Sequence, residues 1–153
     1  MNSSTNISYF YSGQSVWPNQ TEIEKMISWD KAHFPTPWTD QQWRDLGKEE
    51  DYLLAFTSQG FALFKLFKIE GLAHLLKVVT LPEARGLGLG RNLLQDSLFK
   101  IKELGLERFY LEVEEGNLPA QRLYQTLGFK NLHLIKNFYG QGRHAWTMGL
   151  DTP

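Results

Sequence analysis

The sequence predicts one α/β domain in which a single mixed β-sheet is flanked by helices. Its 153 residues suit one domain that buries most of its apolar surface in one core. Strand and helix patterns follow one another in the order β-α-α-β-β-β-α-β-α-β-β. A glycine-rich turn stands between a predicted strand and a long amphipathic helix. These patterns predict about six to seven strands and about four helices, in a domain that spans residues 1–153.

The N-terminal third predicts a short strand followed by two helices. Residues 7–12 form a β-like run, and residues 21–33 carry their apolar side chains on one helical face. Two closely spaced prolines in residues 34–38 must end that helix. A second helix over residues 39–46 follows, and its opening run Thr39 to Gln42 matches a capping box.

The middle of the chain predicts three strands and the longest helix. Residues 52–57 and 61–69 form two β runs around a glycine turn. Residues 72–80 form a third, and paired apolar residues predict that it is buried on both faces. A helix from about residue 89 to 104 carries a leucine-rich apolar stripe that includes Leu104.

The C-terminal third predicts a strand, a short helix and a hairpin that closes the sheet. Residues 108–113 form the strand and residues 119–127 the helix, with Gly128 as its stop. Residues 132–138 and 144–150 form the hairpin.

Composition limits the classes of function. The formal net charge of −1 provides no basic field for nucleic acid. The absence of cysteine excludes disulfides, thiolate metal sites and a cysteine acyl-enzyme. No apolar stretch has the length of a membrane span, and the N-terminus lacks the pattern of a signal peptide. We expect a cytoplasmic protein, monomer or homodimer, without a nucleic-acid or membrane partner.

The histidines show no metal-ligand spacing. We therefore expect no metal site and interpret all of them as ordinary surface or packing residues: His33, His74, His133 and His144.

The turn from Arg85 to Arg91 carries the clearest chemical signal. Gly86, Gly88 and Gly90 lie between a strand and a helix start, where free backbone N–H groups and the helix dipole bind anions. The two arginines add guanidinium groups that suit phosphate oxygens. The alternative is that the glycines serve only a tight turn.

The glycine spacing excludes two common phosphate sites. The dinucleotide pattern G-x-G-x-x-G fails in both registers, because its last position falls on Arg91 or on Leu93. The P-loop ending G-K-[ST] fails at Gly90-Arg91-Asn92. An NAD-dependent oxidoreductase is excluded on this ground, and the pattern R-x-x-G-x-G remains.

This pattern after a buried strand resembles the pyrophosphate-binding motif of the GNAT acetyltransferase superfamily. Residues 111–129 include L-E-V-E-E-G-N and L-Y-Q-T-L-G-F, and they resemble the same region of bacterial ribosomal-protein alanine N-acetyltransferases. Residues 32–38 resemble that family's A-H-x-F-P-W segment with one extra residue, and residues 137–139 its N-Y-Y. The motifs occur in family order from about residue 27 to 148.

The resemblance implies the GNAT fold, with a mixed, mostly antiparallel sheet, and acetyl-CoA as cosubstrate. It implies Glu112 as general base, Tyr124 as general acid, and Trp38, Phe138 and Tyr139 beside the acceptor channel. The residues that it implies for acetyl-CoA are Val78, Val79, Thr80, Arg85, Gly86, Leu87, Gly88, Leu89, Gly90, Arg91 and Asn117.

Direct acyl transfer from a thioester to an amine requires these groups. The amine must lose a proton, and an α-amine with a pKa of about 8 needs only a modest base, acting directly or through water. A phenol of pKa about 10 can protonate a thiolate whose conjugate acid has a pKa of about 8.5. Backbone N–H groups near Val79 and Thr80 can polarise the carbonyl if the strand bulges there.

Each of these side chains also has a purely structural interpretation. Glu112 fits a solvated strand carboxylate, Tyr124 a packing aromatic and Asn117 a helix cap. The aromatic residues Trp38, Phe138 and Tyr139 fit core or hairpin packing equally well.

We therefore expect transfer of an acetyl group to the N-terminal α-amine of a protein, such as a ribosomal protein. Lysine side chains or a small-molecule amine are alternative acceptors. A non-catalytic CoA-binding module is the alternative class; it would keep Arg85 to Arg91 but need neither Glu112 nor Tyr124.

Overall fold

The structure is a computed structural model that describes residues 6–151, in which one seven-stranded sheet has the order β1-β2-β3-β4-β5-β7-β6. Only β4 and β5 pair in parallel; the other neighbours are antiparallel. The strands are β1 Ser8–Tyr11, β2 Tyr52–Thr57, β3 Gly60–Phe67, β4 Leu72–Thr80, β5 Arg108–Glu114, β6 Lys130–Gly140 and β7 Arg143–Asp151. The helices are α1 Gln20–His33, α2 Asp40–Asp45, α3 Leu89–Glu103 and α4 Leu118–Thr126.

The predicted element order and fold class are confirmed. Local signals set the helix ends: Thr39 and Gln42 form the predicted capping box of α2, and a second capping box starts α1. The glycine after α3, Gly105, has a φ of 91°, which favours glycine. Leu104 was predicted in the apolar stripe, but it is 45% exposed because α3 ends one residue before it.

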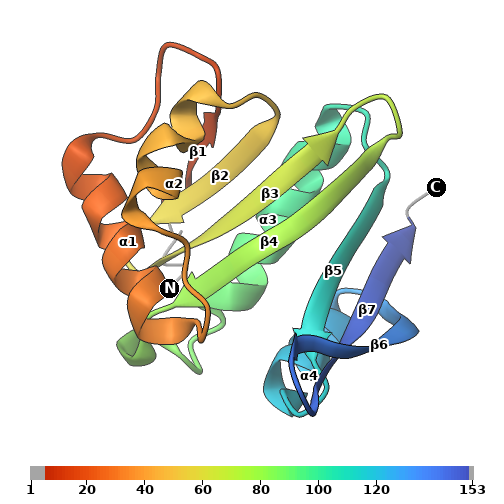
Figure 1. The fold of residues 1–153 in the computed structure, drawn as a ribbon. Helices are drawn as coiled ribbons and strands as arrows, with labels where there is room; N and C mark the ends of the chain where they lie inside the picture. Colours follow the sequence, from red (N-terminus) through yellow and green to blue (C-terminus); the bar gives the residue numbers. More distant parts are fainter. Residues whose placement is uncertain (1–5, 152–153) are drawn as a thin grey trace.

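Helices cover both faces of the first half of the sheet (Figure 1). We call the two faces the α1–α2 face and the α3–α4 face. On the α1–α2 face, Met26 and Trp43 pack on Phe61 and other residues of β2 to β4. On the opposite face, the apolar stripe of α3 and Tyr124 of α4 join a second cluster that includes residues of β2 to β5 and β7.

Strands β4 and β5 pair over a short stretch only. Their register runs from Leu72 opposite Arg108 to His74 opposite Tyr110, and beyond it the strands diverge. The prediction that β4 is buried on both faces is confirmed, because Leu75 belongs to the cluster on the α3–α4 face and Val79 to the cluster on the α1–α2 face. Burial alternates along the strand, and the half-buried positions from His74 to Thr80 line a cleft.

Strand β4 also contains one extra residue relative to β3. Leu63 pairs with Lys77 and Phe64 with Leu75, so Leu76 has no partner in the ladder. The condition for a role of the Val79 and Thr80 N–H groups was a bulge there, but both residues pair regularly with β3 and the bulge lies at Leu76.

The second half of the sheet is covered on one face only. Among the strands, only β1 to β4 contribute to the cluster beneath α1 and α2. All residues of the edge strand β6 are exposed except Tyr139, which is half-buried. None of the helices within residues 6–151 has the length and apolarity needed to cross a lipid bilayer.

Candidate active site

A cleft of about 1100 Å³ opens where β4 and β5 diverge. It brings together residues from β4, the glycine turn, β5, α4 and the β6–β7 hairpin. The predicted residues that line it are Val78, Val79, Thr80, Arg85, Gly86, Gly88, Leu89, Gly90, Arg91, Glu112, Asn117, Tyr124, Phe138 and Tyr139. Two predicted residues, Leu87 and Trp38, do not line it.

The glycine turn has the geometry of an anion site. Gly86 and Gly88 adopt φ values of 80° and 78°, which an L side chain rarely takes. Gly88 caps α3 without any side-chain cap, so the first N–H groups of the helix remain available to a ligand. The Arg85 Nε donates to the Thr80 carbonyl at 3.3 Å, which holds its guanidinium at the cleft. Leu87 points away and is 75% exposed.

Glu112 is paired with a histidine. Its Oε2 lies 2.6 Å from His74 Nε2, and both side chains are 18% exposed. The His74 ring stacks on Tyr110 with centroids 4.0 Å apart and planes 12° apart. Glu112 is thus a paired and largely buried carboxylate rather than a solvated one. His74 packs on Tyr110, as the interpretation of a packing histidine predicts, and it also contacts Glu112.

No motif links His74 to Glu112, because they are separated by 38 residues. The link comes from strand register. His74 lies opposite Tyr110, and Glu112 is two residues further along β5, so its side chain is on the same face of the sheet. A prediction of the β4–β5 pairing would have been needed to find this pair.

Two phenols line the cleft beside the pair. Tyr124 packs edge-on against Phe129, with ring centroids 6.1 Å apart, and burial raises the pKa of Tyr124. Burial and the carboxylates of Glu112 and Glu114 raise the pKa of Tyr139 to about 12. Both hydroxyls therefore carry their protons at neutral pH.

Asn117 caps α4 and also lines the cleft. Its Oδ1 accepts the Ala120 N–H at 3.2 Å as the cap of α4, and the residue also lines the cleft. The structural and the cofactor interpretations of Asn117 are therefore compatible.

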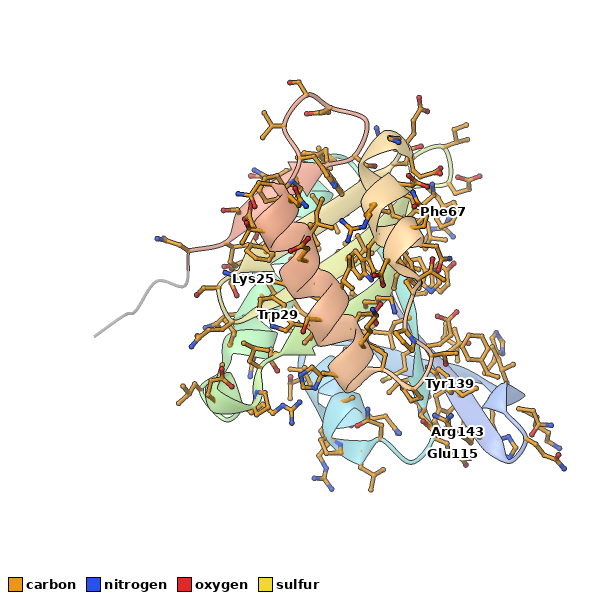
Figure 2. All side chains as sticks on the ribbon, turned by 60° about the vertical axis from the view of Figure 1, so that its left-hand side comes forward. Lys25, Trp29, Phe67, Glu115, Tyr139 and Arg143 are labelled. Atoms are coloured by element: carbon orange, nitrogen blue, oxygen red, sulfur yellow. The ribbon has the colours of Figure 1, made fainter. Side chains whose placement is uncertain are left out.

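The β6–β7 hairpin brings Phe138 and Tyr139 to the cleft through an irregular segment. Pairing is interrupted between Ile135 and Gly140, and Asn137 has a φ of 59°. Figure 2 shows Tyr139 beside Arg143, whose guanidinium lies 5.7 Å from the Tyr139 ring centroid. Arg143 also binds both carboxylate oxygens of Glu114, at 2.9 and 2.7 Å, which lowers the pKa of that carboxyl.

The segment between α1 and α2 is held by a buried ion pair. Asp30 is fully buried, and its carboxylate accepts three hydrogen bonds. The donors are the Lys77 Nζ and the Trp43 Nε1, each at 2.8 Å, and the Trp38 backbone N–H at 2.9 Å. Trp38 is half-buried and packs on Trp43 with ring centroids 5.1 Å apart, as its structural interpretation predicts. Phe34, which the sequence analysis did not select, lines the cleft from this segment.

Within the described residues no group of three or more histidine and carboxylate side chains is arranged to hold a metal ion.

Comparisons with known proteins identify relatives of this arrangement. Residues 17–129 match the model of the acetyltransferase (GNAT) family. The chain is 35% identical over 104 residues to an N-alpha-acetyltransferase of Sulfurisphaera tokodaii, covering 67% of this chain and 62% of that protein. It is 38% identical over 80 residues to the ribosomal protein bS18-alanine N-acetyltransferase of Haemophilus influenzae, covering 52% and 53%. The matched region thus spans less than two thirds of either relative.

Solved structures share the fold. The ribosomal-protein-S18-alanine N-acetyltransferase of Escherichia coli superposes with a TM-score of 0.76 at 21% identity, over 95% of this chain and 94% of that one. A chain of the NatC complex bound to Gag peptide and CoA superposes with a TM-score of 0.78 at 17% identity, over 96% and 99%.

Proposed function

The chain belongs to the acetyltransferase (GNAT) family, and from that premise we propose that it transfers an acetyl group from acetyl-CoA to the N-terminal α-amine of a protein, such as a ribosomal protein. The observation that carries the proposal is that one cleft holds the glycine turn, the Glu112–His74 pair and Tyr124. Relatives named as N-terminal or ribosomal-protein acetyltransferases support the choice of acceptor.

The cleft has the groups that a CoA pyrophosphate and pantetheine arm require. The free N–H groups at the start of α3 and the guanidinium groups of Arg85 and Arg91 suit the phosphates. The unpaired edge of β4 from Leu75 to Thr80 offers backbone donors and acceptors to the amides of the arm. Acetyl-CoA supplies an activated acetyl group as a thioester.

Glu112 accepts the proton of the acceptor amine in this proposal. An ionised carboxylate only accepts hydrogen bonds, so His74 donates its Nε2–H to Glu112 at 2.6 Å. The stacked Tyr110 ring fixes the plane of His74, and His74 in turn fixes the carboxylate. An α-amine has a pKa of about 8, against about 10.4 for lysine, so this base suits an N-terminus better near neutral pH.

Tyr124 holds a proton for the departing thiolate. Because burial raises the pKa of Tyr124, full transfer to a thiolate whose conjugate acid has a pKa of about 8.5 is uphill. The phenol therefore stabilises the thiolate mainly by donating a strong hydrogen bond. When CoA leaves as a thiol, the phenolate regains a proton from solvent, and Glu112 returns to solvent the proton that it took from the amine.

A panel of peptides tests the acceptor. Peptides with free and with blocked N-termini, some containing internal lysines, are incubated with acetyl-CoA, and mass gain and CoA release are measured. We expect one acetyl group on each free N-terminus and none on blocked peptides. Acetylation confined to internal lysines would contradict the proposed acceptor.

The variant Tyr124→Phe separates an enzyme from a CoA-binding module. We expect turnover to fall about 100-fold, a typical contribution of an acid catalyst, while the Kd for acetyl-CoA changes less than about twofold. Steady-state assays of CoA release measure the turnover, and calorimetric titration measures the Kd for acetyl-CoA. A wild-type rate in this variant would remove Tyr124 from the mechanism.

A further inference from the structure

We propose that a groove on the uncovered α1–α2 face of β5, β6 and β7 binds the acceptor chain a few residues after its N-terminus and favours acidic side chains there. The proposal rests on the proposed function, because it takes an N-terminus as the group that enters the catalytic cleft.

The groove has a volume of about 640 Å³ and is separate from the catalytic cleft. Tyr110 and Thr147 form part of its floor, and Arg108, Lys130, His133 and Asp151 stand around it. We call it the sheet groove. One apolar wall is Leu132, whose Cδ1 lies over Gly149 so closely that a Cβ there would be 2.7 Å away.

Strand register places the sheet groove on the same face as Glu112. Tyr110 lies two residues before Glu112 on β5, and Thr147 on β7 pairs directly with Glu112. Residues two apart on a strand, and residues directly opposite in an antiparallel pair, share a face. Side chains of the groove and of the proposed base therefore point to the same side of the sheet.

The groove and the catalytic cleft also meet through one contact. His74 lines the cleft and Tyr110 lines the groove, and their rings stack with centroids 4.0 Å apart. A chain that leaves the base along this face passes directly into the groove.

The opposite face belongs to the proposed acetyl-CoA site. The turn from Arg85 to Arg91 starts α3, whose apolar stripe packs on the α3–α4 face. The α1–α2 face of β5 to β7 contributes no strand residue to the cluster beneath α1 and α2, so its surface is free for the second substrate. An acceptor that reacts in the cleft can therefore leave it on this side.

Strand geometry gives the register of the acceptor. Tyr110 and Arg108 lie two and four residues from Glu112, which corresponds to about 7 and about 13 Å along β5. An extended acceptor advances about 3.3 to 3.6 Å per residue. With its amine at Glu112, the third to fifth residues lie over the groove.

The charges around the groove favour acidic side chains at these positions. Arg108 and Lys130 are cationic, and Asp151 is the opposing carboxylate. Arg108 is held in place, since its Nη2 donates to the Glu70 carbonyl at 2.6 Å. Glutamate at acceptor position three, four or five thus meets net positive charge.

The experiment compares hexapeptides that share their first two residues and carry either glutamate or lysine at positions three to five. At low salt we expect the KM of the glutamate peptide to be about three- to tenfold lower, with equal kcat, and the difference to vanish at high salt. Lys130→Glu should reverse the preference and leave the KM of a dipeptide, which ends before the groove, unchanged. Lys25→Glu makes the same charge change on α1, away from the hairpin (Figure 2). This control variant should keep the preference for the glutamate peptide.

The possible failures are distinct. Equal KM values for the two hexapeptides, or an effect of Lys25→Glu equal to that of Lys130→Glu, would overturn the sheet groove while N-terminal acetylation stands. No acetylation of any free N-terminus would overturn the proposed function and this inference with it.

Discussion

The two halves of the sheet, β1 to β4 and β5 to β7, are covered differently. Helices lie on both faces of the first half, where Leu63 of β3 and its neighbours are 0% exposed (Figure 1). In the second half, helices cover the α3–α4 face only, and β6 is exposed along nearly its whole length. Among the described residues, the first half thus holds most of the core that is covered on both faces, whereas the second half leaves uncovered the face to which we assign the acceptor. The cleft lies where the two halves separate.

The largest effect should come from the ion pair of the first half. Asp30→Asn leaves Lys77 buried without a compensating charge. Such a change typically lowers the free energy of unfolding by about 3 to 5 kcal/mol. Urea unfolding measures the loss. The double variant with Lys77→Met should recover part of it, because no buried charge remains.

Asp45→Asn serves as the control, because its ion pair with Lys48 is at the surface. We expect it to change stability by less than about 0.5 kcal/mol. A loss of similar size in both variants would mean that the buried pair has no special importance.

Truncating one leucine in each half tests the comparison directly. Leu63→Ala removes a fully buried side chain and should cost about 2 to 5 kcal/mol. Leu134→Ala on β6, which is 38% exposed, should cost less than about 1 kcal/mol. Equal losses in urea unfolding would show that β6 is covered in solution, for example by another chain.

Glu112→Gln removes the proposed base at the boundary of the two halves. We expect kcat/KM near pH 7 to fall about 100-fold, about 2.7 kcal/mol. The remaining rate should rise with pH up to about 8, because the amine must then lose its proton unaided. Glu115→Gln, an exposed carboxylate nearby, is the matched control and should leave the pH profile unchanged. An unaltered profile in Glu112→Gln would argue against its role.

Gly88→Ala should have the smallest effect on the free protein. A β-carbon at a φ of 78° should lower the free energy of unfolding by about 1 to 2 kcal/mol, although the space around it is empty. The strain perturbs the start of α3, so the Kd for acetyl-CoA should rise several-fold. Gly116→Ala, at a glycine with open space and without positive φ, is the control. An unchanged Kd in Gly88→Ala would separate the turn from cofactor binding.

Much of the fold could be predicted because its signals are local. Capping boxes begin helices, and prolines and glycines end them, through the backbone of a few adjacent residues. The bounds of β2 and β4 agree with the predicted strands. The site was predictable where a motif is continuous in sequence, as from Arg85 to Arg91. The contacts of Trp38 with Trp43 and Asp30 could not be predicted, because they depend on the ion pair of Asp30 with Lys77, which joins residues 47 apart.

The sequence by itself determined the order of elements, the glycine-rich turn and the family resemblance, because periodicity and turn residues are local features of the chain. Only the tertiary structure decided that His74 binds Glu112, that the bulge lies at Leu76, and that the sheet groove opens beside Tyr110. The reason is strand register: the pairing of β4 with β5 and its early divergence bring distant side chains together and leave one face uncovered.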